Sequence, residues 1–167
     1  MTFKFLSKNF YISFSIVALI YFLDRLTKIY VIQLDKNNLG SDIFNSAYLN
    51  IILIWNKGIA FGLFSFDESH LYNILSLIIS IIVVILVIMS LKSHGFKRYS
   101  LLMIVGGALG NLHDRIFFNA VPDFIDFHVG NFHWFIFNVS DIFITLGVIS
   151  MIILELADNK TEKQNND

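Results

Sequence analysis

The sequence predicts a mainly α-helical membrane protein: a bundle of four transmembrane helices, with a small extracytoplasmic β-rich hairpin between the first and second helices and an aromatic loop between the third and fourth. Three observations support this fold class. Hydrophobic residues make up 56% of the 167 residues, and the mean hydropathy of +0.67 exceeds that of soluble domains. Four apolar segments divide the chain. The segment 71–91 carries no charge and is long enough to span a bilayer alone.

Composition excludes several classes of function. The net charge of −1 gives no basic field for nucleic acid. The absence of cysteine excludes disulfides, thiol nucleophiles and thiolate metal sites. We expect a single membrane domain over 1–157. The polar residues 158–167 are expected to form a disordered cytoplasmic tail.

The first and third apolar segments, 10–23 and 99–112, end in charged residues. Each is about 14 residues, or roughly 21 Å as a helix, which is short of the ~30 Å hydrocarbon core. We therefore expect both helices to continue, with Asp24 and Asp114 inside the membrane and Lys28 and Arg115 reaching outward. The first segment ends in Tyr21-Phe22-Leu23 rather than in the small residues of a cleavage site, so we interpret it as a retained span. The fourth segment covers 135–154, with Asp141 near its start.

The order of the spans places these acids on one side of the membrane. In a four-helix serpentine, the ends of the first and third helices and the start of the fourth lie together. The side that holds the N-terminus is the more basic, with Lys4, Lys8, Lys92, Lys97, Arg98, Lys160 and Lys163, against Lys36 and Lys57 opposite. The positive-inside rule then predicts cytoplasmic termini and carboxylates near the outer leaflet.

The two outer connections differ in composition. In the first, the β-prone run 48–55 precedes the turn signal Asn56-Lys57-Gly58 and the run 59–66, which predicts a hairpin on the membrane surface. The second, 117–137, is dense in Phe and Trp and is expected to be a loop at the headgroup level. Pro122 excludes helix there, so Asp123 is expected on extended backbone.

Helical spacing gives most of the polar residues a structural alternative. Asn111, Asp114 and Arg115 share a helical face, so an Asp–Arg pair could end the third helix. Asp24 and Lys28, four residues apart, are most simply an ion pair.

The start of the fourth helix also has a structural alternative. Asp141, three residues after Asn138, could serve as a helix-terminal charge, with Ser140 as the cap.

Paired acids in an apolar setting nonetheless indicate chemistry. Two carboxylates at low dielectric share one proton, so one can activate water while the other protonates a carbonyl. The residues alone pair Asp141 with either Asp123 or Asp114. Asp123 and Asp126 are expected to face opposite sides of an extended strand. The spacing of His113, His128 and His133 fits no metal-ligand pattern, and histidines at a membrane interface are commonly structural.

Five blocks of sequence resemble the lipoprotein signal peptidase (signal peptidase II) family over about residues 15–155. They are GGALGNLHDR at 106–115, PDFIDF at 122–127, FNVSD at 137–141, DRLTK at 24–28, and Asn50 followed by NKGIAF at 56–61. The resemblance implies an aspartic endopeptidase of the bacterial inner membrane. Such an enzyme removes signal peptides from diacylglyceryl prolipoproteins by cutting before the lipidated cysteine.

The resemblance also implies roles for individual residues. It makes Asp123 and Asp141 the catalytic pair, and Asp114 a partner of Arg115. Residues expected to bind substrate or support the pair are Asp24, Lys28, Asn56, Gly58, Asn111, Asp114, Arg115 and Asn138. It implies no cofactor and no metal, and we expect a monomer in contact with membrane lipid. The chain departs from the family pattern at His113, Pro122 and Ser140, and none of these changes removes a catalytic group.

Two other functions stay open at this point. A metal-dependent lipid-headgroup transferase could use Asp114, Asp123, Asp126 and Asp141 as Mg²⁺ ligands, although the usual dense run of acids on neighbouring helical turns is missing. A non-enzymatic membrane scaffold or channel subunit would need none of these acids.

Overall fold

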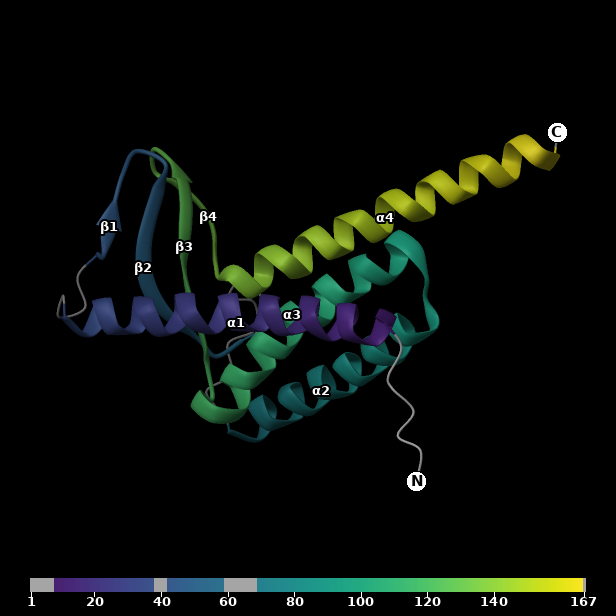
Figure 1. Cartoon of the computed structure of the whole chain (residues 1–167). Coiled ribbons are helices and arrows are strands. Elements are labelled where there is room, and N and C mark those ends of the chain that lie inside the picture. The colour runs from purple at the N-terminus through teal and green to yellow at the C-terminus, as the bar shows by residue number, and fades with distance from the viewer. Residues whose placement is uncertain (1–7, 38–41, 59–68, 167) are drawn as a thin grey trace, which may run out of the picture.

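The computed structural model describes residues 8–37, 42–58 and 69–166. Its four helices and four strands are α1 (Lys8–Asn37), β1 (Phe44–Asn45), β2 (Leu49–Asn56), α2 (Ser69–Lys92), α3 (Gly95–Phe118), β3 (Val121–Val129), β4 (Phe132–Phe137) and α4 (Val139–Asn166). The strands form one sheet at one end of the helices (Figure 1). Helices α1 and α3 run toward this sheet, and α2 and α4 run away from it. The predicted convergence of the acid-bearing helix ends is therefore confirmed.

Each helix is long and apolar enough to cross a membrane, so the chain is a multi-pass membrane protein. As expected, α1 continues through Asp24 and Lys28, and α3 continues through Asp114. Helix α3 is the centre of the bundle, since α1, α2 and α4 all pack against it. Its Gly107 permits the contact with α4, because a Cβ there would lie 2.4 Å from the Ser140 carbonyl oxygen.

The sheet joins the connection between α1 and α2 and the connection between α3 and α4 into one unit. All neighbouring strands pair antiparallel in the order β1-β2-β3-β4. The predicted aromatic loop is thus a β-hairpin, closed by a two-residue turn with Gly130 at φ +59°. Consecutive aromatic residues hide the alternation that marks a strand, and β3 also depends on pairing with the distant β2. The run 59–66 lies outside the described residues.

Two boundaries differ from those predicted. Helix α4 begins at Val139 rather than near residue 135, because 132–137 belong to β4. The tail, expected to be disordered, continues α4 to Asn166. Its Glu, Lys and Gln residues are good helix formers, and a helix that already exists bypasses the cost of nucleation.

Candidate active site

One asparagine connects the two acids that resemble the family's catalytic pair. Asp123 lies in β3 and Asp141 in the first turn of α4, and their exposed fractions are only 3% and 8%. The Asn138 side-chain amide donates to Asp123 Oδ1 at 2.6 Å. The Asn138 backbone N–H donates to Asp141 Oδ2 at 3.1 Å. The structure therefore brings together residues that are 18 positions apart and belong to different elements.

Asn138 also begins α4. Its side-chain Oδ1 accepts from the Asp141 backbone N–H at 3.2 Å, while the Asp141 carboxylate accepts from the Asn138 N–H. This reciprocal arrangement is a capping box. The cap is Asn138 rather than Ser140, which corrects the prediction. Asp141 is thus both a helix-terminal residue and part of the acidic pair.

Two further asparagines hold the other carboxylate oxygens. Asn56, at the end of β2, donates to Asp123 Oδ2 at 2.9 Å. Asn111 of α3 donates to Asp141 Oδ1 at 2.8 Å. Each of the four carboxylate oxygens therefore accepts a hydrogen bond from an asparagine. Among the described residues, neither acid forms a salt bridge.

This environment favours retention of a proton. Burial, followed by the nearby negative charge of Asp141, raises the pKa of Asp123 to about 6. The hydrogen bonds from Asn56 and Asn138 act in the opposite direction but do not cancel that rise. At mildly acidic to neutral pH, the pair can therefore hold one proton between its two carboxyl groups.

A second group of buried charges lies between α1 and α3. We call Asp24, Arg25, Lys28 and Asp114 the charged cluster. Asp114 accepts from Arg25 at 2.5 and 2.7 Å and from Lys28 at 2.6 Å. Asp24 accepts from Arg25 at 2.8 Å and pairs with Lys28 at 3.0 Å. Two acids and two bases thus neutralise one another, and the predicted Asp24–Lys28 pair is confirmed.

The predicted Asp114–Arg115 pair is wrong. Adjacent residues of a helix point in different directions, so these two side chains diverge. Arg115 instead donates to the Asn111 carbonyl at 3.2 Å and to the Gly58 carbonyl at 3.0 Å. Gly58 follows Asn56, whose Oδ1 accepts from the Gly58 N–H at 2.8 Å. Arg115 therefore holds the chain segment that presents Asn56 to Asp123.

The charged cluster contacts two groups that lie next to Asp141. Lys28 donates to Asn111 Oδ1 at 2.9 Å, which fixes that amide with its NH₂ toward Asp141. Asp24 accepts from the Ser140 backbone N–H at 3.0 Å, at the start of α4. The cluster thus sets the position of groups that hold Asp141.

The remaining acid of the stretch, Asp126, lies elsewhere on the sheet. It is buried like Asp123, so neither of the two acids expected on opposite sides of the strand points to solvent. Its carboxylate contacts His133 Nδ1 at 2.9 Å and Asn50 Nδ2 at 3.4 Å. Side chains of the two neighbouring strands, Asn50 and His133, contact Asp126, and the alternation along one strand does not foresee such contacts.

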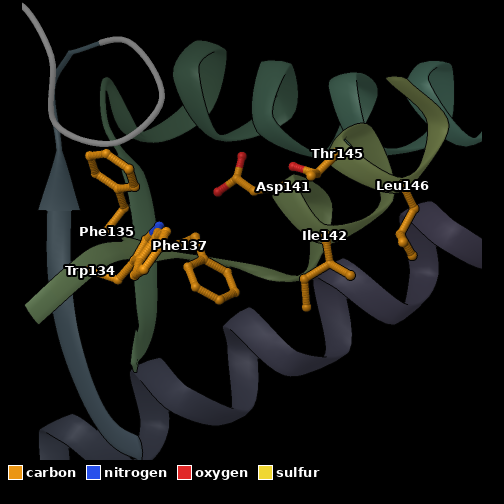
Figure 2. A pocket seen from close by; sticks show the side chains of 7 residues that line it. All are labelled: Trp134, Phe135, Phe137, Asp141, Ile142, Thr145 and Leu146. Carbon is orange, nitrogen blue, oxygen red and sulfur yellow. The ribbon is translucent and has the colours of Figure 1, made fainter. Parts of the chain in front are cut away.

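An apolar cavity of about 350 Å³ opens beside Asp141. Figure 2 shows the Asp141 carboxylate between aromatic side chains of β4 and apolar side chains of α4. The lining residues are Trp134, Phe135, Phe137, Asp141, Ile142, Thr145 and Leu146. An apolar group could therefore approach the acidic pair without crossing a polar surface.

Sequence reasoning missed one side chain of this centre. Arg25 was not among the candidate site residues, yet it binds both acids of the charged cluster. Its position directly after Asp24, in a span otherwise poor in charge, was the available signal.

Comparison with known proteins agrees with these features. A family model described as signal peptidase (SPase) II matches residues 16–157. The lipoprotein signal peptidase of Pelagibacter ubique (strain HTCC1062) is 48% identical over 160 residues, covering 95% of this chain and 96% of that protein. That of Anaplasma phagocytophilum (strain HZ) is 45% identical over 136 residues, covering 80% of this chain and 85% of that protein.

Solved structures show the same fold. One bacterial membrane enzyme is 29% identical with a TM-score of 0.72, covering 89% of this chain and 90% of that one. A second is 31% identical with a TM-score of 0.71, covering 87% and 93%. The chain therefore belongs to the signal peptidase II family and is a multi-pass membrane peptidase.

Proposed function

We propose that this peptidase removes signal peptides from lipoprotein precursors by aspartic catalysis at Asp123 and Asp141. The observation that supports this most is the pair itself: two buried carboxylates held by asparagines, without a neutralising cation in direct contact among the described residues. The names of the relatives support the substrate class, since they are lipoprotein signal peptidases.

The pair can carry out peptide hydrolysis with one shared proton. The ionised carboxylate takes a proton from water as the water oxygen attacks the scissile carbonyl carbon. The protonated carboxyl donates to the carbonyl oxygen, which gives a tetrahedral intermediate. As the intermediate collapses and the C–N bond breaks, the carboxyl that took the proton from water gives it to the leaving amine. A hydroxyl of the intermediate returns a proton to the other carboxylate, so the pair again holds one. Asn56, Asn111 and Asn138 keep the oxygens in place without neutralising them.

The position of the pair suits a substrate anchored in lipid. It lies where the sheet meets the ends of apolar helices, and the cavity beside Asp141 is lined mainly by aromatic and aliphatic groups. We propose cytoplasmic termini and a pair near the outer leaflet of a bacterial inner membrane. Diacylglyceryl chains of the precursor would then stay in lipid while its peptide reaches the carboxylates. We propose that cleavage occurs before the lipidated cysteine.

The test uses purified full-length protein in detergent or lipid. The protein is incubated in parallel with three substrates: a diacylglyceryl precursor, the same precursor without lipid, and a precursor whose lipidated cysteine has been moved to another position. Mass spectrometry identifies the new N-terminus of each product. We expect cleavage of the first substrate alone, before its cysteine.

A chelator distinguishes the rival functions. We expect full turnover in excess EDTA, below the unfolding temperature, because no step of hydrolysis uses a metal. Activity that requires added Mg²⁺ would favour a lipid-headgroup transferase. Absence of cleavage of any precursor by folded protein would favour a scaffold.

A further inference from the structure

The tip of the β3–β4 hairpin gathers a second set of side chains that the peptidase chemistry does not use. Asp126 and His128 lie two residues apart on β3, and His133 on β4 pairs with His128 across the strands. One potential ligand atom from each of the three lies within 4.8 Å of the other two. The spacing looked unlike a metal motif in the sequence, because the set is assembled by strand pairing rather than along one element.

The three side chains lie close together, at a spacing slightly wider than a shared metal ion needs. The imidazole rings of His128 and His133 are nearly parallel, at 20°, with centroids 5.0 Å apart. His133 Nδ1 already contacts both Asp126 oxygens, at 3.1 and 2.9 Å. His128 Nδ1 is buried and has no hydrogen-bond partner in the described part of the chain. His128 therefore has a buried nitrogen that lacks a partner, and its side chain lies near a carboxylate and a second imidazole.

We propose that Asp126, His128 and His133 bind a divalent transition metal, with Zn²⁺ as the ion that fits best. Two imidazoles and one carboxylate are ligands typical of zinc, whereas Mg²⁺ and Ca²⁺ prefer oxygen-rich sites. Ligand atoms at about 2.0–2.2 Å from one ion lie at most about 4 Å apart. The His133 side chain is 52% exposed, so a rotation of it can close the remaining gap.

A metal here would link β3, which carries Asp123, to β4, which leads into the helix that carries Asp141. Asp123 precedes Asp126 by three residues on β3, and β4 leads from His133 into Asn138 and α4. A metal that binds the folded hairpin and not the unfolded chain stabilises the fold by mass action. The site is separate from the pair and supplies no step of hydrolysis. The bound metal would hold β3 against β4. Its occupancy would depend on the concentration of free Zn²⁺ around the sheet.

The test measures binding rather than peptidase activity. Full-length protein with its affinity tag removed is stripped with chelator and titrated with Zn²⁺, and with Co²⁺ as a coloured substitute that reports coordination. We expect one equivalent to bind and the Tm to rise. His128→Phe keeps a ring for stacking but removes a metal ligand. We expect the affinity for Zn²⁺ to fall by at least about tenfold, because loss of a residue that only supports a ligand already costs that much.

Two controls make the result specific. His94 is exposed in the turn between α2 and α3, and His94→Ala should bind Zn²⁺ as the unmodified protein does. Asp123→Asn should also bind normally, which separates this site from the proposed peptidase function. Equal affinity of His128→Phe and the unmodified protein, or no saturable binding in the micromolar range, would overturn the proposal.

Discussion

Two sets of buried acids lie close together in this protein, and they are satisfied in opposite ways. In the charged cluster, Asp24 and Asp114 accept from Arg25 and Lys28, and the charges cancel. In the acidic pair, Asp123 and Asp141 accept only from asparagines and backbone groups among the described residues. Both sets are almost fully buried, so burial alone does not distinguish them.

The difference shows which acids can exchange a proton. A carboxylate paired with a cation is stabilised in its ionised form, and its protonation costs the ion pair. A carboxylate held by neutral amides and placed near another acid has no such constraint. The cluster therefore suits the joining of α1 to α3, and the pair suits hydrolysis.

The largest expected effect on stability comes from Asp114→Asn. The substitution leaves Arg25 and Lys28 with Asp24 as the one remaining acid of the cluster, so we expect a loss of about 3–5 kcal/mol in the free energy of unfolding. Chemical unfolding in detergent micelles measures it. The exposed Glu155→Gln on α4 is the control and should change stability by less than about 0.5 kcal/mol. A loss below about 1 kcal/mol, or normal stability with no turnover, would contradict a structural role for the cluster.

The pH dependence of stability gives the next effect. Because the folded pKa of Asp123 is raised from 3.8 to about 6, the folded state binds more protons than the unfolded state between these values. This contribution to stability is present below pH 3.8 and is lost as pH rises through about 6. The difference corresponds to roughly 3 kcal/mol. We expect Asp123→Asn to flatten the slope of Tm against pH in this window, and an unchanged slope would count against the shifted pKa.

The smallest effect separates the two roles of Asn138. Asn138→Ala removes the cap of α4 and should cost about 1–2 kcal/mol. Asn138→Ser keeps an acceptor for the Asp141 N–H but loses the amide that donates to Asp123. We therefore expect Ser to restore most of the stability but not the turnover, as measured by Tm and by precursor cleavage. Equal recovery of both would show that Asn138 only caps the helix.

Much of the fold could be predicted because its signals are local. Four apolar segments gave the helices, and their order alone placed Asp24, Asp114 and Asp141 at one end. The strands of the second connection were missed because β3 forms by pairing with β2, about 70 residues earlier. Aromatic residues at successive positions concealed the alternation of β4.

The sequence predicted which residues form the candidate site better than it predicted which of them contact one another. The motifs supplied Asp123, Asp141 and the three asparagines, all of which meet in the structure. The partner of Asp114 could not be read from the chain, because the adjacent Arg115 looked sufficient and the real partners lie on another helix. Contacts between helices depend on how the helices pack, and the spacing of residues along one helix gives no information about that packing.

The most direct test of the acidic pair is turnover of a diacylglyceryl precursor by purified Asp123→Asn and Asp141→Asn. Asp42→Asn, an exposed acid just before β1, serves as the matched control. We predict that each pair variant inserts and folds but loses at least about a thousandfold in turnover, within the range for acid–base groups, while the control stays near the unmodified rate. A tenth or more of normal turnover in either pair variant would contradict catalysis by these two carboxylates.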